Sequence, residues 1–317
     1  MKPDAGLEHF VASFAANEAV LAESSPAWLA PLRRDAIEKF ASLGFPTRKN
    51  EAWKYTNVGA IAKAAFDPSP TANGAVSSGD VRALLADRAQ ECTLVFIDGR
   101  FDRELSTPAA QSSGLVVGSL SDALAESPTE LRPLLEAPDS LQRPFTALNG
   151  AFQRDGAYVR VTRGVQWEQP IQLIFVATPE AAGRIANPRN LISIDAGASA
   201  AVMLHYASLC DASYSTNAVT QVRVGVDAEL DLVTIQSESD SAYHLSSVDV
   251  MQDRDSRFRS HWVSLGGALA RNEVHARLDA PGTDCALNGL FVAGGEQHVD
   301  SQTTIDHASP HGTSREL

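Results

Sequence analysis

The chain has 317 residues, of which 44% are hydrophobic and 21% are charged, proportions that are ordinary for a globular protein. Its formal charge of −13 argues against a nucleic-acid-binding protein, because such proteins carry clustered lysines and arginines. No apolar run approaches the ~20 residues of a membrane span, and residues 1–6 lack the apolar core of a secretory signal. The composition therefore predicts a cytoplasmic protein that binds neither nucleic acid nor membrane.

The three cysteines, Cys92, Cys210 and Cys285, lie far apart and form no CxxC pair. An odd number of dispersed cysteines does not predict a disulfide framework or a thiolate site for a metal or cluster within one chain. We interpret each cysteine as a small buried hydrophobic residue.

Residues 1–150 are predicted to form a mostly helical domain that includes a short mixed α/β segment. Pro26 separates two apolar stripes at helical spacing, and Gly44 with Pro46 ends the second stripe. The pattern predicts a helical hairpin. The stripes consist of Leu7, Phe10, Val11, Phe14 and Leu21, and of Leu29, Leu32, Ala36, Phe40 and Leu43.

Two short strands are predicted in the mixed segment. The first covers residues 93–97 and is followed by Asp98-Gly99, a strong hairpin-turn signal. The second covers residues 115–117, and Ser121 is predicted to cap a short helix that follows it.

From about residue 151 to residue 317 helical periodicity disappears, and apolar residues alternate with polar ones, as in strands with one buried face. Examples are Val222, Val224 and Val226, and Val274, Ala276 and Leu278. Small residues recur at the corners between these runs, for example at 194–198, 224–228 and 278–282. The pattern alone leaves a sandwich and a β-helix solenoid open, and it favours the solenoid because small residues permit tight corners between stacked rungs.

The last thirty residues contain the candidate metal ligands, namely His298, His307 and His311, with Asp300 nearby. His298 and Asp300 would share one face of a strand, and His307 and His311 could converge across a corner. Imidazole and carboxylate are suitable ligands for iron or zinc. The spacing matches no established metal motif, so the pattern favours polar side chains on an outer face. We predict no catalytic, cofactor or metal residues, with these three histidines as the only candidates.

Residues 48–56 combine aromatic and basic side chains around Trp53, as an interface would. The favoured interpretation is that Trp53 and the stems of Lys49 and Lys54 pack against a neighbouring element. The chain has no GxxxxGK[ST] loop, no GxGxxG after a strand and no nucleophile-elbow motif, and it is therefore predicted not to be an enzyme.

Three separated motifs resemble the SufB/SufD family of iron–sulfur cluster assembly proteins, and they favour its SufD branch. The first is Arg-Lys-x-Glu-x-Trp-Lys-Tyr-Thr at residues 48–56. The others are the entry into the β region and a late β motif, at residues 144–152 with 156–159, and at 289–300, 303–307 and 310–314. The resemblance implies a mainly β fold: a right-handed parallel β-helix over 151–317, preceded by the small helical domain over 1–150.

The resemblance also implies a non-catalytic scaffold subunit of the Suf complex that pairs with SufB and with the ATPase SufC. The sequence ends before the last rungs and the C-terminal helical domain of the family, so we expect a truncated chain that has lost SufC docking. We expect no bound cofactor in this chain alone. Whether it forms a homodimer is left open.

Two alternatives from other functional classes stay open. A β-helix polysaccharide lyase or hydrolase would need paired carboxylates, for which Asp300 and Asp306 are the pair to test. A metal-binding module would use His298, His307 and His311.

Overall fold

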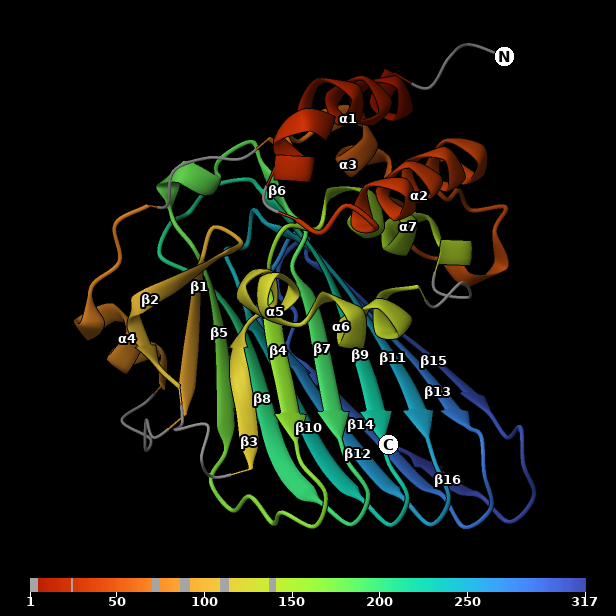
Figure 1. Cartoon of the computed structure of the whole chain (residues 1–317). Helices are drawn as coiled ribbons and strands as arrows, with labels where there is room; N and C mark the ends of the chain where they lie inside the picture. The colour runs from red at the N-terminus through yellow and green to blue at the C-terminus, as the bar shows by residue number, and fades with distance from the viewer. Residues whose placement is uncertain (1–4, 24, 70–73, 86–91, 109–113, 137–140) are drawn as a thin grey trace.

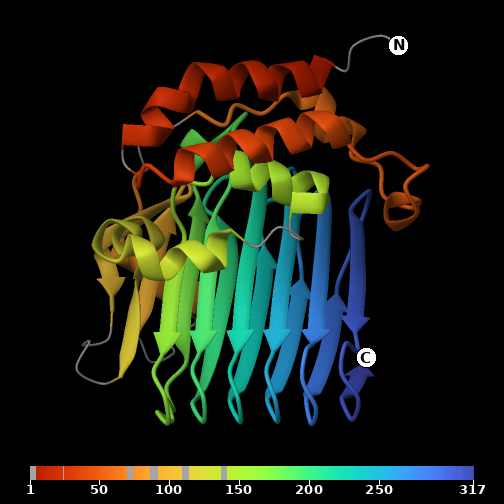
Figure 2. The ribbon, with the colours of Figure 1, turned by 45° about the vertical axis from the view of Figure 1, so that its right-hand side comes forward.

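The computed structural model of the chain describes residues 5–23, 25–69, 74–85, 92–108, 114–136 and 141–317. A layer of helices lies across one end of the strands of a flattened β-solenoid (Figure 1 and Figure 2). The mainly β fold with a small helical region before it confirms the predicted fold class. No helix among the described residues is both long and apolar enough to span a membrane.

The predicted helical hairpin is present as α1 (Ala5–Glu23) and α2 (Leu29–Leu43). Gly44 ends α2 in a left-handed conformation with φ of +65°, and its N–H donates to the carbonyl of Phe40. The Phe10 ring contacts those of Phe40 and Phe152, and the latter belongs to α7 (Pro144–Phe152). The hairpin and α7 therefore share one aromatic core.

The remaining helical segments are short. They are η1 (Glu51–Trp53), α3 (Gly59–Ala64), α4 (Ser78–Leu85), α5 (Leu120–Glu126), α6 (Pro128–Leu135) and η4 (Pro179–Ala181). The prediction that Ser121 caps the short helix is wrong, because Ser119 is the N-cap of α5 and accepts a hydrogen bond from the backbone N–H of Asp122. Ser121 lies inside the first turn, and its N–H donates to Asp155 instead.

The two strands predicted in the mixed segment are confirmed as β1 (Thr93–Ile97) and β3 (Leu115–Ser119). β1 forms an antiparallel hairpin with β2 (Arg100–Thr107), and Asp98 and Gly99 at its turn both have positive φ. β1 also pairs in parallel with β5 (Ile171–Ala177), and β3 pairs antiparallel with β4 (Ala157–Val161), so both strands extend the solenoid sheets. The domain division at residue 150 stays a prediction.

The solenoid consists of two sheets whose strands alternate along the chain. One sheet has the order β16-β14-β12-β10-β8-β5-β1-β2, and the other has the order β15-β13-β11-β9-β7-β4-β3, with β6 beside β9. The solenoid strands are β4 (Ala157–Val161), β5 (Ile171–Ala177), β6 (Ile185–Ala186), β7 (Arg189–Ile194), β8 (Ser199–Ser208), β9 (Ser215–Val224), β10 (Glu229–Ser237), β11 (Tyr243–Gln252), β12 (Arg257–Ser264), β13 (Leu269–Leu278), β14 (Asp284–Phe291), β15 (His298–Asp306) and β16 (Thr313–Glu316).

All pairs between successive rungs are parallel, which excludes the sandwich of antiparallel sheets. In Figure 1 the chain descends through β4, β7 and β9, ascends through the sheet behind them, and advances to the right with each rung. The coil is therefore right-handed, as the resemblance implied.

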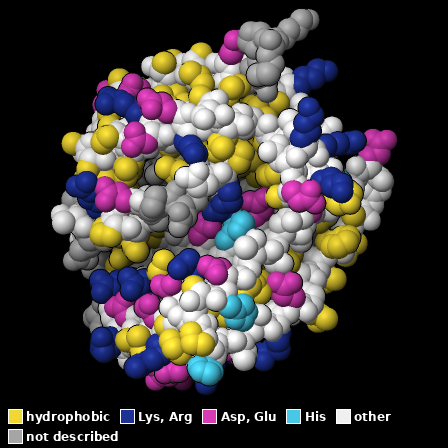
Figure 3. Space-filling view, turned by 90° about the vertical axis from the view of Figure 1, so that its right-hand side faces the viewer, with side chains coloured by type: hydrophobic (Ala, Val, Ile, Leu, Met, Phe, Trp, Pro, Cys, Tyr) yellow, Lys and Arg dark blue, Asp and Glu magenta, His cyan; other side chains and the backbone are white. Residues whose placement is uncertain are grey.

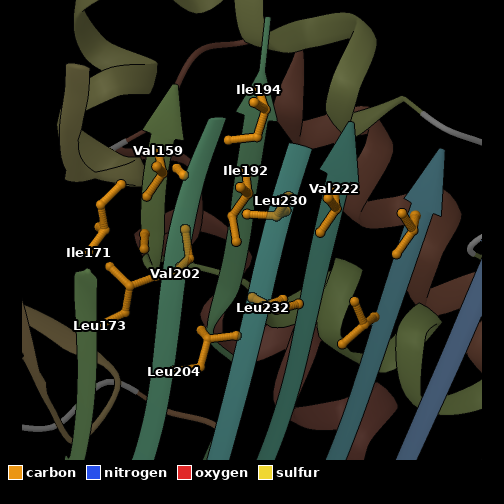
Figure 4. Packing of buried hydrophobic residues seen from close by; sticks show 14 of the residues in the cluster. Val159, Ile171, Leu173, Ile192, Ile194, Val202, Leu204, Val222, Leu230 and Leu232 are labelled. Atoms are coloured by element: carbon orange, nitrogen blue, oxygen red, sulfur yellow. The ribbon is translucent and has the colours of Figure 1, made fainter. Parts of the chain in front are cut away.

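The solenoid core lies between the two sheets and is lined by the alternating apolar residues that the sequence pattern predicted. Figure 4 shows side chains from both sheets meeting there, among them Ile192, Val202, Leu204, Leu230 and Leu232, each at most 2% exposed. In β13 the apolar residues Val274, Ala276 and Leu278 are buried, while the residues between them reach solvent. Burial of these stripes is the main driving force that holds successive rungs together.

The small-residue corners are tight turns, as predicted. Gly197, Gly267, Gly282 and Gly295 have positive φ at corners between solenoid strands. Gly266 lies so close to the rung before it that a Cβ would stand 2.0 Å from the carbonyl oxygen of Glu238. A larger residue at that corner would push adjacent rungs apart.

Candidate functional site

The candidate site is the end of the solenoid formed by β13 to β16, where the late sequence motif lies. Within the described part of the chain, β15 pairs only with β13 and β16 pairs only with β14, so the outer edge of each sheet has no strand beside it. Figure 3 faces this end and shows histidines spread among acidic, basic and polar side chains. A sheet edge exposes backbone N–H and C=O groups that can pair with another chain.

His298 and Asp300 lie on the same face of β15, as the strand spacing predicted. Both contact the hydroxyl of Thr56, which lies 3.1 Å from His298 Nε2 and donates to the Asp300 carboxylate. Thr56 is the last residue of the aromatic and basic motif near the N-terminus. The early and late motifs, separated by more than two hundred residues of sequence, are therefore in direct contact.

Arg271 on β13 joins the two motifs more firmly. Its guanidinium is 1% exposed and donates to Glu273, to Asp300 and, over 2.7 Å, to the backbone carbonyl of Ala52. It also lies over the ring of Trp53, with 3.8 Å between its central carbon and the ring centroid. Arg271 is not among the residues predicted above, although the run Arg271-Asn272-Glu273 gives a signal, because it places polar residues in an otherwise apolar buried stripe.

The pKa of Glu273 follows from this cluster. Burial alone would raise it, but His275 and Arg271 outweigh that effect and hold the pKa below its ordinary value. The carboxylate is therefore charged at neutral pH and is balanced by the buried arginine. Removal of either partner of such a buried pair would leave an uncompensated charge, which is strongly destabilising.

The packing interpretation of Trp53 agrees with the structure, because Trp53 is 7% exposed and its ring contacts Phe145 of α7. Lys49 and Lys54 are exposed as whole residues, and the packing of their stems stays a prediction. Lys49 precedes and Lys54 follows the 3₁₀ helix η1, whose residue Trp53 is buried.

The candidate histidines do not converge on one site. His307 Nε2 lies 3.0 Å from the hydroxyl of Ser314, and His311 occupies an exposed turn with φ of +64°. Within the described ranges, no group of three or more His, Cys, Asp or Glu side chains is arranged to hold a metal ion. A metal-binding role for His298, His307 and His311 stays a prediction, which titration with zinc or ferrous iron would test.

Two of the three cysteines are buried hydrophobic residues as predicted. Cys92 and Cys285 belong to the solenoid core, and burial raises the pKa of the Cys285 thiol to about 12. Cys210 differs, because it is partly exposed and its thiol donates to the carbonyl of Thr178.

The carboxylates considered for glycoside chemistry are each paired with an arginine. Asp300 binds Arg271, and Asp306 lies 2.9 Å from Arg277. The two aspartates are therefore parts of separate ion pairs.

An exposed apolar patch lies at the top of the same solenoid end. Leu290, Phe291 and Val292 are 58%, 60% and 60% exposed, and Leu265, on the rung before, is 46% exposed. The N–H of Val292 donates to Ser264, which precedes Leu265, so the four residues are neighbours. We call these four residues the end patch. Contiguous exposed apolar residues of this size are typical of contact surfaces.

The fold is a right-handed parallel β-solenoid with a layer of helices across one end of its strands. Comparison with known proteins is specific. Residues 5–173 match the family model described as the SufBD protein N-terminal region, and residues 175–317 match that of the SufBD core domain of the SUF iron–sulfur cluster assembly system. The chain belongs to the SufBD family.

Among curated relatives, an iron–sulfur cluster assembly SufBD family protein of Synechocystis is 25% identical over 311 residues, which cover 95% of this chain and 68% of the relative. Iron–sulfur cluster assembly protein SufD of Escherichia coli is 27% identical over 90% of this chain and 65% of its own length. SufB of Bacillus subtilis is 28% identical over 54% of this chain and 36% of its own length. The chain spans about two thirds of the length of the first two relatives.

Proposed function

We propose that this chain is a non-catalytic scaffold subunit of the cytoplasmic Suf system of SufB, SufD and the ATPase SufC, and that it pairs with a SufB subunit through the solenoid end formed by β13 to β16. Membership of the SufBD family supports a role in iron–sulfur cluster assembly. The observation that carries the finer proposal is the solenoid end, where two sheet edges and the end patch lie together.

The solenoid end offers both kinds of contact that strand pairing needs. The edges of β15 and β16 present backbone donors and acceptors, which supply affinity without a specific side-chain code. The end patch adds apolar area, and Phe291 is the type of large aromatic anchor that dominates binding energy at interfaces. A partner built from a similar solenoid could continue the stack of rungs.

The positions of the three thiols support the expectation that this chain alone binds no iron–sulfur cluster. An iron–sulfur cluster requires several thiolates close together. Cys92 and Cys285 are buried in the core, and Cys210 is held against the backbone of Thr178. We therefore expect no iron–sulfur absorption band after anaerobic reconstitution of the isolated chain, and such a band would contradict this part of the proposal.

Binding to the SufB subunit of the same organism tests the pairing. We expect a complex in size-exclusion chromatography and calorimetry, and we expect Phe291→Asp to weaken it at least about tenfold, because the change places a charge in an apolar contact. Met251→Asp is the matched control, since Met251 is 44% exposed and lies on β11 of the other sheet. The proposal fails if SufB does not bind, if Phe291→Asp binds as tightly as the unchanged chain, or if both variants lose binding equally.

A further inference from the structure

The outer face of the sheet that contains β10, β12 and β14 is apolar over successive rungs. Leu232 on β10 belongs to the core, so Val233 and Ile235 on the same strand point outward. Ile235 lies in register beside Val263 on β12, and Val263 lies beside Leu290 on β14. Val233, Ile235 and Val263 are partly exposed, and they belong to none of the hydrophobic clusters of the described residues. We call these three residues the sheet face; they meet the end patch at Leu290 but are not part of it.

A helix already covers the same side of this sheet at its other end. Ile174 on β5 and Ile235 on β10 lie in one row, because both are in register with His205 on the strand between them. Ile174 is nevertheless 0% exposed, and it shares a cluster with Val81 and Leu84 of α4. Figure 1 shows α4 on the β1–β2 side of the molecule. The fold therefore uses two apolar residues, three positions apart on a short helix, to cover the start of this row.

A second helix would match the sheet face in size and pattern. Neighbouring strands lie ~4.8 Å apart and a helix with its side chains is about 10 Å across, so one helix covers about two or three strands. The sheet face and Leu290 occupy three adjacent strands of one sheet, β10, β12 and β14. An amphipathic helix presents apolar side chains at positions i, i+3, i+4 and i+7, which supply the complementary apolar stripe.

The two flanks of the sheet face differ in charge. The corners that follow β8, β10 and β14 carry the exposed carboxylates of Asp211, Asp240 and Glu296, and they contain no lysine or arginine. Asp211 and Asp240 accept hydrogen bonds from Ser239 and Gln297, which are neutral and leave the charge unbalanced. Near the starts of the strands, in contrast, three carboxylates and three arginines form ion pairs with one another; they are Glu229, Asp231, Asp284, Arg257, Arg259 and Arg315. A docked helix is therefore favoured by positive charge on the side of the acidic corners.

We propose that the sheet face binds an amphipathic helix of a partner protein, whose apolar side covers Val233, Ile235 and Val263 and whose flank toward the acidic corners carries lysines or arginines. The packing of α4 on this sheet supports a helix as the occupant, and the three carboxylates support its basic flank. The same carboxylates, in a chain of charge −13, oppose contact with an anionic lipid surface. The proposed pairing with SufB does not use these three residues, so either proposal can fail without the other.

Fluorescence anisotropy with labelled synthetic peptides and the 317-residue chain tests the proposal. The probe is a peptide of about 18 residues, long enough to form a helix, with leucines at helical spacing on one side and lysines on the other. In a second peptide glutamates replace the lysines, and a third has the composition of the first in scrambled order. We expect the lysine peptide to bind saturably, and the other two to bind at least about tenfold more weakly.

Variants of the chain locate the binding. Ile235→Asp should weaken binding of the lysine peptide at least about tenfold, because it places a charge in an apolar contact. Asp211→Asn combined with Asp240→Asn should weaken it by about twofold to tenfold and reduce its salt dependence. Met251→Asp is the matched control, because Met251 is 44% exposed on the outer face of the other sheet.

Circular dichroism melts establish that each variant is folded, and Val263→Ser is a milder change on the same face if Ile235→Asp does not fold. The proposal is overturned if the lysine peptide does not bind, or if the scrambled or glutamate peptide binds as tightly. It is also overturned if the folded variants of Ile235 and Val263 bind as tightly as the unchanged chain, or if Met251→Asp weakens binding as much as they do.

Discussion

The two ends of the solenoid are built from the same rungs but are covered differently. At the first end, β2 and β3 close the sheets with antiparallel pairs, and α5 packs beside β3. Behind the mostly exposed edge strand β2, β1 and β5 are buried throughout, from Thr93 to Ile97 and from Ile171 to Ala177. At the other end, no residue of β15 is fully buried, and every residue of β16 is exposed.

The difference separates what the rungs need for folding from what they offer to a partner. A rung in the middle is stabilised by neighbours on both sides, as in other repeat proteins. A terminal rung lacks half of these contacts and keeps its edge free for pairing. Within the described residues, β15 and β16 are therefore expected to contribute less to stability than the rungs in the middle.

Arg271 is the sharpest test of that comparison, because it is a buried ion pair within the more open end. Arg271→Ala would leave Glu273 and Asp300 without their buried cation and would release Trp53, so we expect a loss of about 3–5 kcal/mol in the free energy of unfolding. Arg277→Ala on the same strand, where the arginine is 51% exposed, should cost at most about 1 kcal/mol. Urea unfolding followed by circular dichroism measures both, and equal losses would contradict the assignment of Arg271 as the link.

Substitution of two isoleucines compares the tightness of core packing in the covered part of the solenoid with that at the open end. Ile192 on β7 is 2% exposed and packs between the sheets, and Ile192→Ala should cost about 2–5 kcal/mol. Ile305 on β15 is only partly buried against the same core, and Ile305→Ala should cost less than about 1.5 kcal/mol. The measurement is again urea unfolding. If both variants lost stability equally, the open end would be as tightly packed as the middle.

Local signals explain what the sequence predicted well. Three features were predicted correctly: the end of α2 at Gly44, the Asp98-Gly99 turn, and the alternation of buried Val274 and Ala276 with polar neighbours. Each depends on residues within a few positions of one another. These determine backbone conformation and side-chain direction directly. The residue pattern favoured a solenoid but left a sandwich open. The resemblance of the three motifs to the SufB/SufD family implied the solenoid directly.

Long-range contacts explain what the sequence did not predict. Arg271 donates to the carbonyl of Ala52, 219 positions earlier, and Thr56 contacts His298, 242 positions later. The helical and strand periodicities of the sequence describe neighbouring residues only, so they do not predict such contacts. The end patch was also missed, since Leu290 and Phe291 look like ordinary strand residues until the structure shows that nothing among the described residues covers them.

Gly→Ala substitutions at two corners compare how closely the backbone of each corner packs against its surroundings. A Cβ at Gly266 would stand 2.0 Å from the Glu238 carbonyl oxygen, so Gly266→Ala should force adjacent rungs apart and cost about 1–3 kcal/mol. At Gly294, in a corner near the open end, the nearest atom to such a Cβ is the Gln297 side-chain oxygen at 4.0 Å, and Gly294→Ala should change stability by less than about 0.5 kcal/mol. Thermal melts compare the two, and a Gly266→Ala variant as stable as the unchanged chain would refute this account of the close-packed corner.

The smallest expected effect is a dependence of stability on pH that belongs to the covered part of the solenoid. Burial alone would raise the pKa of Glu238, but His244, Thr216 and Gln236 outweigh burial and lower it below its ordinary value of 4.5. Because the folded-state pKa is the lower one, this contribution is present above pH 4.5 and is lost as the pH falls through the folded-state value.

Glu238→Gln should therefore lower stability at pH 7 and make the decline between pH 5 and pH 3 shallower, by about 1 kcal/mol for each unit of pKa shift removed. Glu296→Gln, at an exposed position near the open end, should leave the decline as steep as in the unchanged chain. Urea unfolding at a series of pH values measures the slopes. An equally steep decline in Glu238→Gln would mean that other carboxylates, and not this buried pair, set the acid stability of the solenoid.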